Sequence, residues 1–282
     1  MTDDADTPLT RRGALALGGA ALGGYALSGT AFASSHTDGG DGTDGDGMDG
    51  DGSDGDGPDG AGTGGGSRSY RVTVANLTSG QPFTPPAVAL HRPDVEVFSV
   101  GDPANTQTQQ LAENGNLQPL LDLIEATDSI RAAAVADAPL VPSHDPGDTG
   151  NPYHATLELS ADASATHLTF VSMLIATNDG LVGLDTVPLP ERVNASRTYY
   201  ANGYDVGTEE NTEDFDDMVP PAQSLIQGGS ADGGTTESDP DIAEDDVIRP
   251  HPGITGDDDL DPSEYGWREP AGLVQVERLG TQ

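Results

Sequence analysis

The stretch 170–209 constrains the fold more than any other part of the chain. It opens with FVSMLIA, an apolar run rich in Val, Leu and Ile that is too short to cross a membrane. A run of this kind between turn signals is typical of a buried strand. It ends in the turn cluster TNDG at 177–180, and alternating residues at 200–204 indicate a further strand. The stretch therefore predicts two core strands, each followed by a polar loop.

Three acidic side chains come directly after these strands. Asp179 lies in the first loop, and Asp205 and Glu209 lie in the second, which reads DVGTE. Gly207 between these two acids allows a tight turn. Calcium takes about six to eight oxygen ligands, and carboxylates on loops of a rigid sheet supply them. The pattern predicts a Ca²⁺ site, with ordinary exposed acids as the alternative in a chain with 48 Asp and Glu residues.

The charge balance limits the classes of partner. The formal net charge is -37, and all eleven basic residues are Arg. This balance argues against nucleic acid and against anionic membrane as partners. A Lys-free acidic surface is similar to that of proteins from high-salt organisms. The chain has no Cys, which excludes disulfides, thiol chemistry and Cys-ligated zinc.

Residues 1–33 are predicted to be a twin-arginine signal peptide. Arg11 and Arg12 precede a weakly hydrophobic run rich in Gly and Ala, and AFA at 31–33 fits a small-x-small cleavage site. A retained N-terminal anchor is the alternative. No later segment has about 18 consecutive apolar residues, so we expect no membrane span in the mature protein. The expected location is outside the cell or at the cell surface.

Residues 34–68 are predicted to be a disordered acidic linker. The segment consists largely of Asp-Gly repeats. Glycine leaves the unfolded backbone maximal freedom, and such a segment cannot bury enough apolar surface to fold. Residues 44–49, DGDGMD, resemble the start of an EF-hand calcium loop, but the Glu that closes such a loop does not follow. We therefore interpret the segment as a flexible tether.

The folded domain is predicted over residues 69–282. Apolar alternation indicates strands, and 117–126 places apolar residues on one face of a helix. Residues 104–113 indicate a weaker helix, and the Ala-rich segment 130–141 is ambiguous. The expected strands are 70–76, 87–92, 95–100, 153–159, 167–176, 200–204 and 273–279, with 153–159 and 167–176 forming a hairpin. The fold class is therefore all-β, an antiparallel sandwich of about eight strands with one or two short helices.

Two further patterns leave alternatives open. Glu264 and Glu269 flank Trp267, and paired carboxylates of this kind also occur in sugar hydrolases. An extracellular hydrolase is thus the alternative to a binding protein. Because the chain has no G-x-S-x-G elbow, no Gly-rich phosphate loop and no ligand spacing among its His residues, we expect no enzyme. Asn76 and Asn194 each begin a glycosylation sequon, and the sequence does not decide whether either is modified.

Several motifs in a fixed order resemble the spondin N-terminal domain in its prokaryotic secreted form. They span about 70–279 and read YRVTVANLTSGQPFTPP, QQLAENGN, MLIATNDGLVGLDTVPLP, YDVGTEEN, RPHPGI and WREP. The resemblance implies an eight-stranded antiparallel sandwich. It also implies a calcium site made by Asp179, Asp205 and Glu209, although the family often has Asp at the last position. The disulfide-rich modules of the animal members are absent, so their adhesion roles do not transfer. We expect an exported calcium-binding module for adhesion or binding, with an unknown extracellular or cell-surface ligand.

The export prediction can be tested by replacing Arg11 and Arg12 with Lys. The variant is expected to remain in the cytoplasm, because the twin-arginine pathway reads the arginine pair itself. Immunoblots of cell and medium fractions measure the distribution, with Arg68→Lys as the control outside the signal. Normal secretion of the double variant would show that residues 1–33 are not a twin-arginine signal.

Overall fold

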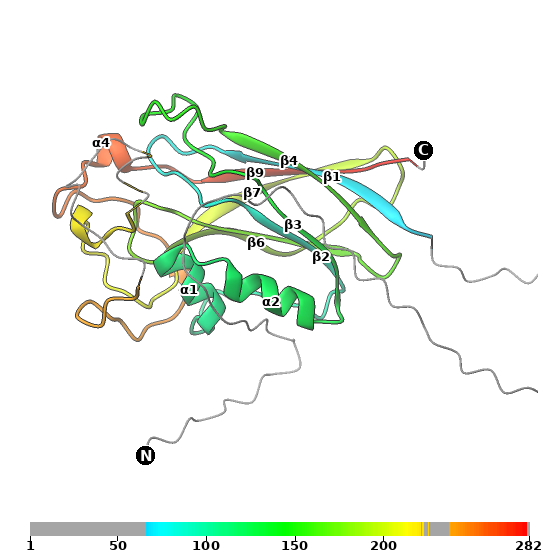
Figure 1. The fold of residues 1–282 in the computed structure, drawn as a ribbon, viewed down its shortest axis with the longest axis horizontal. Coiled ribbons are helices and arrows are strands. Elements are labelled where there is room, and N and C mark those ends of the chain that lie inside the picture. The colour runs from blue at the N-terminus through cyan, green and yellow to red at the C-terminus, as the bar shows by residue number, and fades with distance from the viewer. Residues whose placement is uncertain (1–65, 221, 223–224, 226–236, 281–282) are drawn as a thin grey trace, which may run out of the picture.

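The computed structural model describes residues 66–220, 222, 225 and 237–280 of the chain. The predicted signal peptide and all but the last residues of the predicted linker lie outside the described residues, so both stay predictions. The described part is a strand-rich body with two helices on one side (Figure 1).

The described residues fold mainly into antiparallel strands. In chain order these are β1 (Arg68–Asn76), β2 (Ala87–His91), β3 (Ile130–Val135), β4 (His154–Ala161), β5 (His167–Met173), β6 (Gly180–Pro188), β7 (Ser196–Asp205), β8 (Arg249–Pro250) and β9 (Gly272–Arg278). The helical segments are α1 (Thr106–Asn114), α2 (Gln118–Ala126), η1 (Phe215–Asp217) and α4 (Pro262–Tyr265). The predicted all-β class with few short helices is confirmed.

The strands form one sheet that folds over into two layers. Their order is β3-β2-β5-β6-β7-β9-β1-β4, with β8 added to β7. Strand β6 pairs with β7 only from Gly180 to Gly183. Beyond this point β6 stays with β5, whereas β7 pairs with β9. The short β6–β7 pairing is therefore the fold line, and the end strands β3 and β4 come to lie side by side.

Strand β5 is buried on both faces, which explains its continuous apolar run. Phe170 packs between the two layers with residues of β1 and β9. Val171 and Met173 point to the other side, where they join a second core with α1 and α2. A strand covered on both sides has no polar face, so its sequence shows no alternation.

Two expectations about strands are wrong. Residues 95–100 form an irregular loop rather than a strand; Val95, Val97 and Phe98 pack onto the α1–α2 core, whereas Val100 is exposed. The predicted hairpin does not exist, because β4 pairs with β1 while β5 pairs with β2 and β6. Strand β4 is exposed on alternate residues and β5 is not, so the two strands belong to different layers despite their spacing. The ambiguous Ala-rich segment forms β3 over its first residues.

A buried Gln ties the loop after β1 to the end of β5. The Gln81 side chain is fully buried. Its Nε2 donates to the backbone oxygens of Ala176 and Tyr265, and its Oε1 accepts from the backbone N–H of Ala176. One side chain thus fixes the start of the 177–180 turn against α4.

Asn76 lies in the same buried network. Its exposed fraction is 2%, and its Nδ2 donates to the backbone oxygens of Gln81 and Leu140. This nitrogen is the atom that glycosylation would modify, so the folded chain does not offer the first sequon. Asn194 is exposed, and its modification stays open.

Replacing Gln81 by Ala is expected to lower the free energy of unfolding by about 2–4 kcal/mol. The change leaves buried backbone groups of Ala176 and Tyr265 without partners. Urea unfolding measures the loss. The control is Gln275→Ala at an exposed position of β9, for which we expect a change within about 0.5 kcal/mol. Equal losses would mean that the Gln81 network contributes little.

Candidate metal centre

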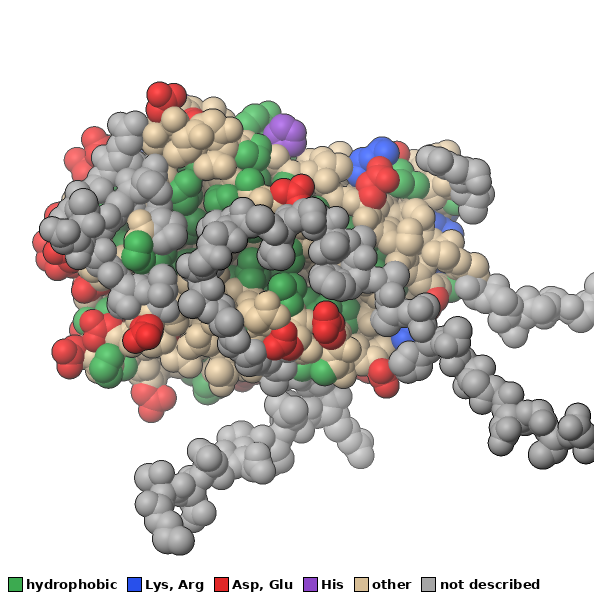
Figure 2. All heavy atoms as spheres, in the orientation of Figure 1, with side chains coloured by type: hydrophobic (Ala, Val, Ile, Leu, Met, Phe, Trp, Pro, Cys, Tyr) green, Lys and Arg blue, Asp and Glu red, His purple; other side chains and the backbone are tan. Residues whose placement is uncertain are grey.

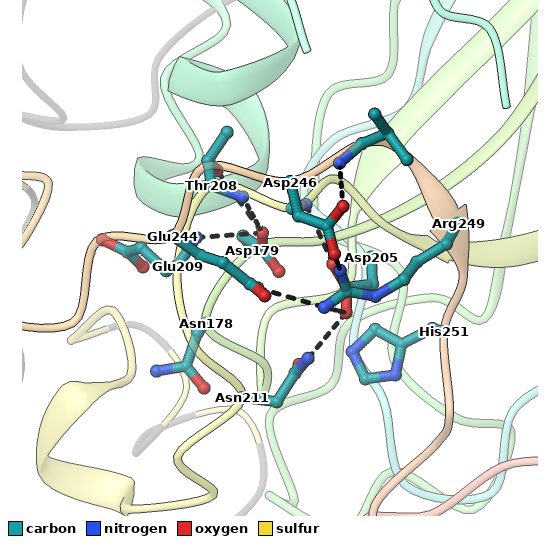
Figure 3. A network of polar contacts seen from close by, with 12 residues as sticks. Asn178, Asp179, Asp205, Thr208, Glu209, Asn211, Glu244, Asp246, Arg249 and His251 are labelled. Carbon is teal, nitrogen blue, oxygen red and sulfur yellow. Dashed lines mark hydrogen bonds and ion pairs between the residues drawn. The ribbon is translucent and has the colours of Figure 1, made fainter. Parts of the chain in front are cut away.

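The β6–β7 pairing brings the predicted acids to one place. Asp179 immediately precedes β6, Asp205 is the last residue of β7, and Gly180 pairs directly with Asp205. The backbone N–H of Glu209 reaches Asp179 Oδ2 at 3.2 Å. All three predicted residues therefore lie in one polar network, drawn in Figure 3.

The turn before β6 requires glycine. Thr177 Oγ1 donates to the backbone oxygen of Leu174 and accepts from the N–H of Gly180 at 2.9 Å. A Cβ at Gly180 would come within 2.2 Å of that hydroxyl oxygen, a distance that no side chain tolerates. The local sequence TNDG thus fixes the direction in which Asp179 leaves the turn.

Asp179 is a fully buried carboxylate with one satisfied oxygen. Its Oδ2 accepts from the N–H groups of Thr208 at 2.7 Å and of Glu209. Its Oδ1 is buried and has no hydrogen-bond partner among the residues that the structure describes. Burial raises the pKa of Asp179 to about 6, and the negative charge of Asp205 adds to the rise. A carboxylate oxygen that is buried without a hydrogen-bond donor makes the ionised carboxylate unstable unless a cation binds it.

Glu209 is buried beside it. Its Oε1 accepts from the backbone N–H of Asp239 at 3.0 Å. Burial raises the pKa of Glu209 to about 8, against the lowering effect of that hydrogen bond, and the charges of Glu113 and Asp179 add to the rise. The carboxyl group of Glu209 is thus strongly perturbed.

Asp205 is different, because it already has a cation. Its Oδ2 accepts from Asn211 Nδ2 at 2.6 Å and lies 2.9 Å from Arg249 Nη2. Arg249, on β8, also forms ion pairs with Glu244 and Asp246. Sequence analysis missed Arg249. The available signal was weak: it is the only basic residue between positions 198 and 267.

His251 is a second residue that sequence analysis missed. Its Nδ1 accepts from the N–H of Gly253 at 3.0 Å, so the ring proton lies on Nε2, a buried atom without a partner. Burial lowers the pKa of His251 to about 4, with Glu213 opposing and Arg249 adding to the shift. Figure 3 shows the ring beside Arg249 and Asp205. The ring also packs on Trp267, with 4.9 Å between ring centroids. It is a neutral hydrogen-bond donor at neutral pH.

Comparison with protein family models assigns the chain to a family. The Spondin_N family model matches residues 78–222, just over half of the chain, including β2 to β7 and all three acids. The chain belongs to the Spondin_N family. The predicted resemblance is therefore confirmed, and Spondin_N domains are typically extracellular binding or adhesion modules and generally non-catalytic. No curated protein matches the chain.

The described part of this Spondin_N protein contains no helix with the length and apolar character that a bilayer crossing needs. Strands β1 and β9 lie outside the matched range but pair with each other within the same sheet. The folded unit therefore extends beyond the family match on both sides.

The site of this Spondin_N domain fits a hard cation in part. The free Oδ1 of Asp179 and the buried carboxyl of Glu209 are hard oxygen donors that need positive charge. Asp205, however, is held by Arg249 and Asn211. Among the described residues, no three His, Asp or Glu side chains converge as a ready-made metal shell. The three-residue calcium site therefore stays a prediction, with Asp179 as its best-supported member.

The acids near Trp267 have a structural arrangement in this Spondin_N domain. Glu269 Oε1 accepts from the N–H of Gly203 and from Trp267 Nε1, and its Oε2 accepts from the N–H of Ala271. Glu264 is exposed on α4. The hydrogen bonds of Glu269 tie the C-terminal loop to β7, which supports an anchoring role rather than the hydrolase alternative.

The raised pKa of Glu209 predicts that stability falls as pH rises. In chelator, the folded state keeps a proton on Glu209 up to about pH 8, whereas the unfolded state has already released it. The free energy of unfolding should therefore fall by on the order of 1 kcal/mol between pH 6.5 and pH 8. The lowered pKa of His251 lies below this window.

Urea unfolding at several pH values measures this fall. Glu209→Gln should remove it, and Glu210→Gln, at the exposed neighbouring position, should retain it. A flat wild-type profile would show that the Glu209 carboxyl is ionised in the fold.

Proposed function

We propose that this protein is an exported calcium-binding module that serves in adhesion or binding at the cell envelope or outside the cell. The observation that supports calcium is Asp179 Oδ1, a buried carboxylate oxygen without a partner, next to two more buried acids. A divalent cation supplies the positive charge and the oxygen coordination that this atom lacks.

The distribution of charge in the network supports the same proposal. Arg249 divides its single positive charge among Asp205, Glu244 and Asp246. Among the described residues, Asp179 and Glu209 take part in no ion pair, and burial together with the charge of Glu113 raises the pKa of both. Two buried carboxyl groups thus remain for a cation to neutralise.

The donor set favours calcium over softer metals. The candidate ligands offer oxygen only, and the chain has no Cys. His251 carries its proton on the unpartnered nitrogen, so that nitrogen has no lone pair for a metal. Asp179 and Glu209 would hold the ion first, and Asp205 would join them by exchanging its contact with Arg249.

Calcium at this place would join segments that are far apart in sequence. Asp179 belongs to the turn before β6, and Glu209 belongs to the loop after β7 and holds the N–H of Asp239. The ion would stabilise the end of the sandwich from which the long loops emerge. Surface loops on a rigid sheet are where binding modules carry their contact residues.

Calorimetric melting of the full chain, with calcium or with chelator at fixed ionic strength, tests the proposal. A ligand that binds only the native state stabilises it by about 2.7 kcal/mol at a hundredfold excess over Kd. Asp179→Asn and Glu209→Gln should abolish most of the calcium-induced rise in Tm, and Asp205→Asn should reduce it. Glu210→Gln is the control and should keep the full rise.

The quantity compared is the calcium-induced change in Tm, because Asp205→Asn also breaks the Arg249 ion pair and lowers Tm by itself. If Asp179→Asn keeps the full calcium-induced rise in Tm, calcium does not bind at this site. The acids would then be a buried polar network that Arg249 alone organises.

A further inference from the structure

Three arginines stand on one face of three neighbouring strands, at the end of the sandwich opposite the acids. Arg278 of β9 pairs with Tyr70 of β1, which is buried between the layers. Directly paired residues point to the same face, and so do residues two apart on one strand. Arg68 lies two residues before Tyr70, and Arg197 of β7 pairs with buried Val276. All three guanidinium groups therefore leave from the inward face, where the two layers part.

An open cavity of about 380 Å³ lies at this end. It forms where β7 has left β6 and the connecting loop crosses from one layer to the other. A fourth arginine, Arg192, comes from that loop. The lining consists of Pro190, Glu191, Arg192, Ala195, Ser196 and Arg197. All the arginine blue that is visible in Figure 2 lies in the right-hand half of the molecule, toward the end where β1 begins in Figure 1.

These arginines lack acidic partners. Within the described part of the chain, no side-chain hydrogen bond or ion pair engages the guanidinium groups of Arg68, Arg192 or Arg197. Arg278 donates to the backbone oxygen of Glu191, and its Nε is buried without a partner. By contrast, Arg71 on the outer face of β1 forms ion pairs with Glu158 and Glu277. Arg192 and Arg197 line the cavity, and guanidinium groups without acidic partners are the groups that recognise oxyanions.

We infer that this arginine end binds an anionic polysaccharide through carboxylate or sulfate groups on its sugars. Neighbouring strands are about 4.8 Å apart, and the pairing register offsets Arg68 of β1 from Arg197 of β7 by four residues along the strands, so these two arginines are separated by about 16 Å. One small anion cannot contact them all, whereas successive charged sugars of a polymer can. A cavity of this volume is also of the size that holds a small ligand.

Other macromolecules fit this end less well. An acidic peptide that binds as an added strand needs a free sheet edge. Strands β1 and β9 are each paired on both sides, and β7 has β9 as its one strand partner over residues 196–201, so poly-glutamate is the competitor that separates an added peptide strand from a polysaccharide. Single-stranded nucleic acid needs aromatic side chains on which bases stack, and the cavity lining contains none.

The overall charge of the protein does not prevent such binding. Strand β7 runs from the arginine end to Asp205 over ten residues, which is about 33 Å. The Debye length is about 8 Å at physiological ionic strength, so the acids at the far end are screened there. Glu191 is the acidic residue in the lining, which also contains Arg192 and Arg197.

Fluorescence polarisation with a labelled alginate oligosaccharide tests the inference. The full chain is titrated in chelator, so that the result does not depend on the proposed calcium site. We expect binding of the oligosaccharide and none of neutral dextran. Free glucuronate should compete only at a concentration at least about a hundredfold higher, because it supplies one carboxylate at a time.

Arg192→Gln/Arg197→Gln should weaken binding at least about tenfold, and Arg71→Gln should change it less than about twofold. Thermal melts confirm that each variant is folded. If the double variant melts early, the single variant Arg192→Gln on the exposed loop carries the test, with an expected loss of about threefold or more.

Four outcomes would overturn the inference. In the first, Arg71→Gln loses as much affinity for the oligosaccharide as the double variant does. In the second and third, free glucuronate competes at the same concentration as the oligosaccharide, or poly-glutamate binds as tightly. In the fourth, the intact chain does not bind the oligosaccharide.

Discussion

The pairing of β6 with β7 over four residue positions is the contact on which the rest of the structure depends. Within the part of the chain that the structure describes, it is the only segment at which the layer containing β5 continues into the layer containing β9. Because the pairing begins at Gly180 and Asp205, it places two strand ends, each with a carboxylate, against each other. The same few hydrogen bonds therefore join the two layers and create the candidate site. Any change that separates β6 from β7 would be expected to disturb both.

Burial distinguishes these acids from ordinary surface carboxylates. Exposed acids at two neighbouring strand ends would be ordinary surface charges, screened by water and salt. Here Asp179 and Asp205 are fully buried and Glu209 nearly so. The buried charge of Asp205 is balanced by its ion pair with Arg249, whereas Oδ1 of Asp179 has no hydrogen-bond partner among the described residues. Arg249 thus neutralises Asp205, whereas Asp179 and Glu209 have no cationic partner among the described residues. These two buried carboxyl groups are the reason to expect a cation as ligand.

Much of the fold could be predicted from the sequence, because its strongest signals come from burial. The apolar run of β5 and the alternation of β1 and β9 follow directly from which faces are covered. Segment 130–135 was ambiguous because alanine favours helices, whereas its small side chain is what fits where β3 approaches β4. The apolar loop 95–100 imitated a strand, since packing needs apolar residues whether or not the backbone is extended.

The candidate site could be predicted only in outline. Acids at strand ends suggested that Asp179 and Asp205 lie together, and they do. Nothing in the sequence showed that Oδ1 would have no donor or that His251 would be buried beside Trp267. Arg249 belongs to a two-residue strand in a segment dense with turn signals. Its contact with Asp205 depends on tertiary pairing that no local pattern encodes.

The two ends of the sandwich have opposite chemistry, and each is determined by where strands begin and stop. Strand β7 contributes to both ends, because Arg197 lies near its start and Asp205 is its last residue. Coupling between distant sites requires an element with two discrete arrangements that both sites bias. The intervening part of β7 is paired with β9 and then with β6, and its inward residue Ala201 is packed in the inter-layer core. A continuous, packed strand of this kind has a single arrangement. A cation at one end and a polyanion at the other would therefore bind independently, which suits a module that joins two different surfaces.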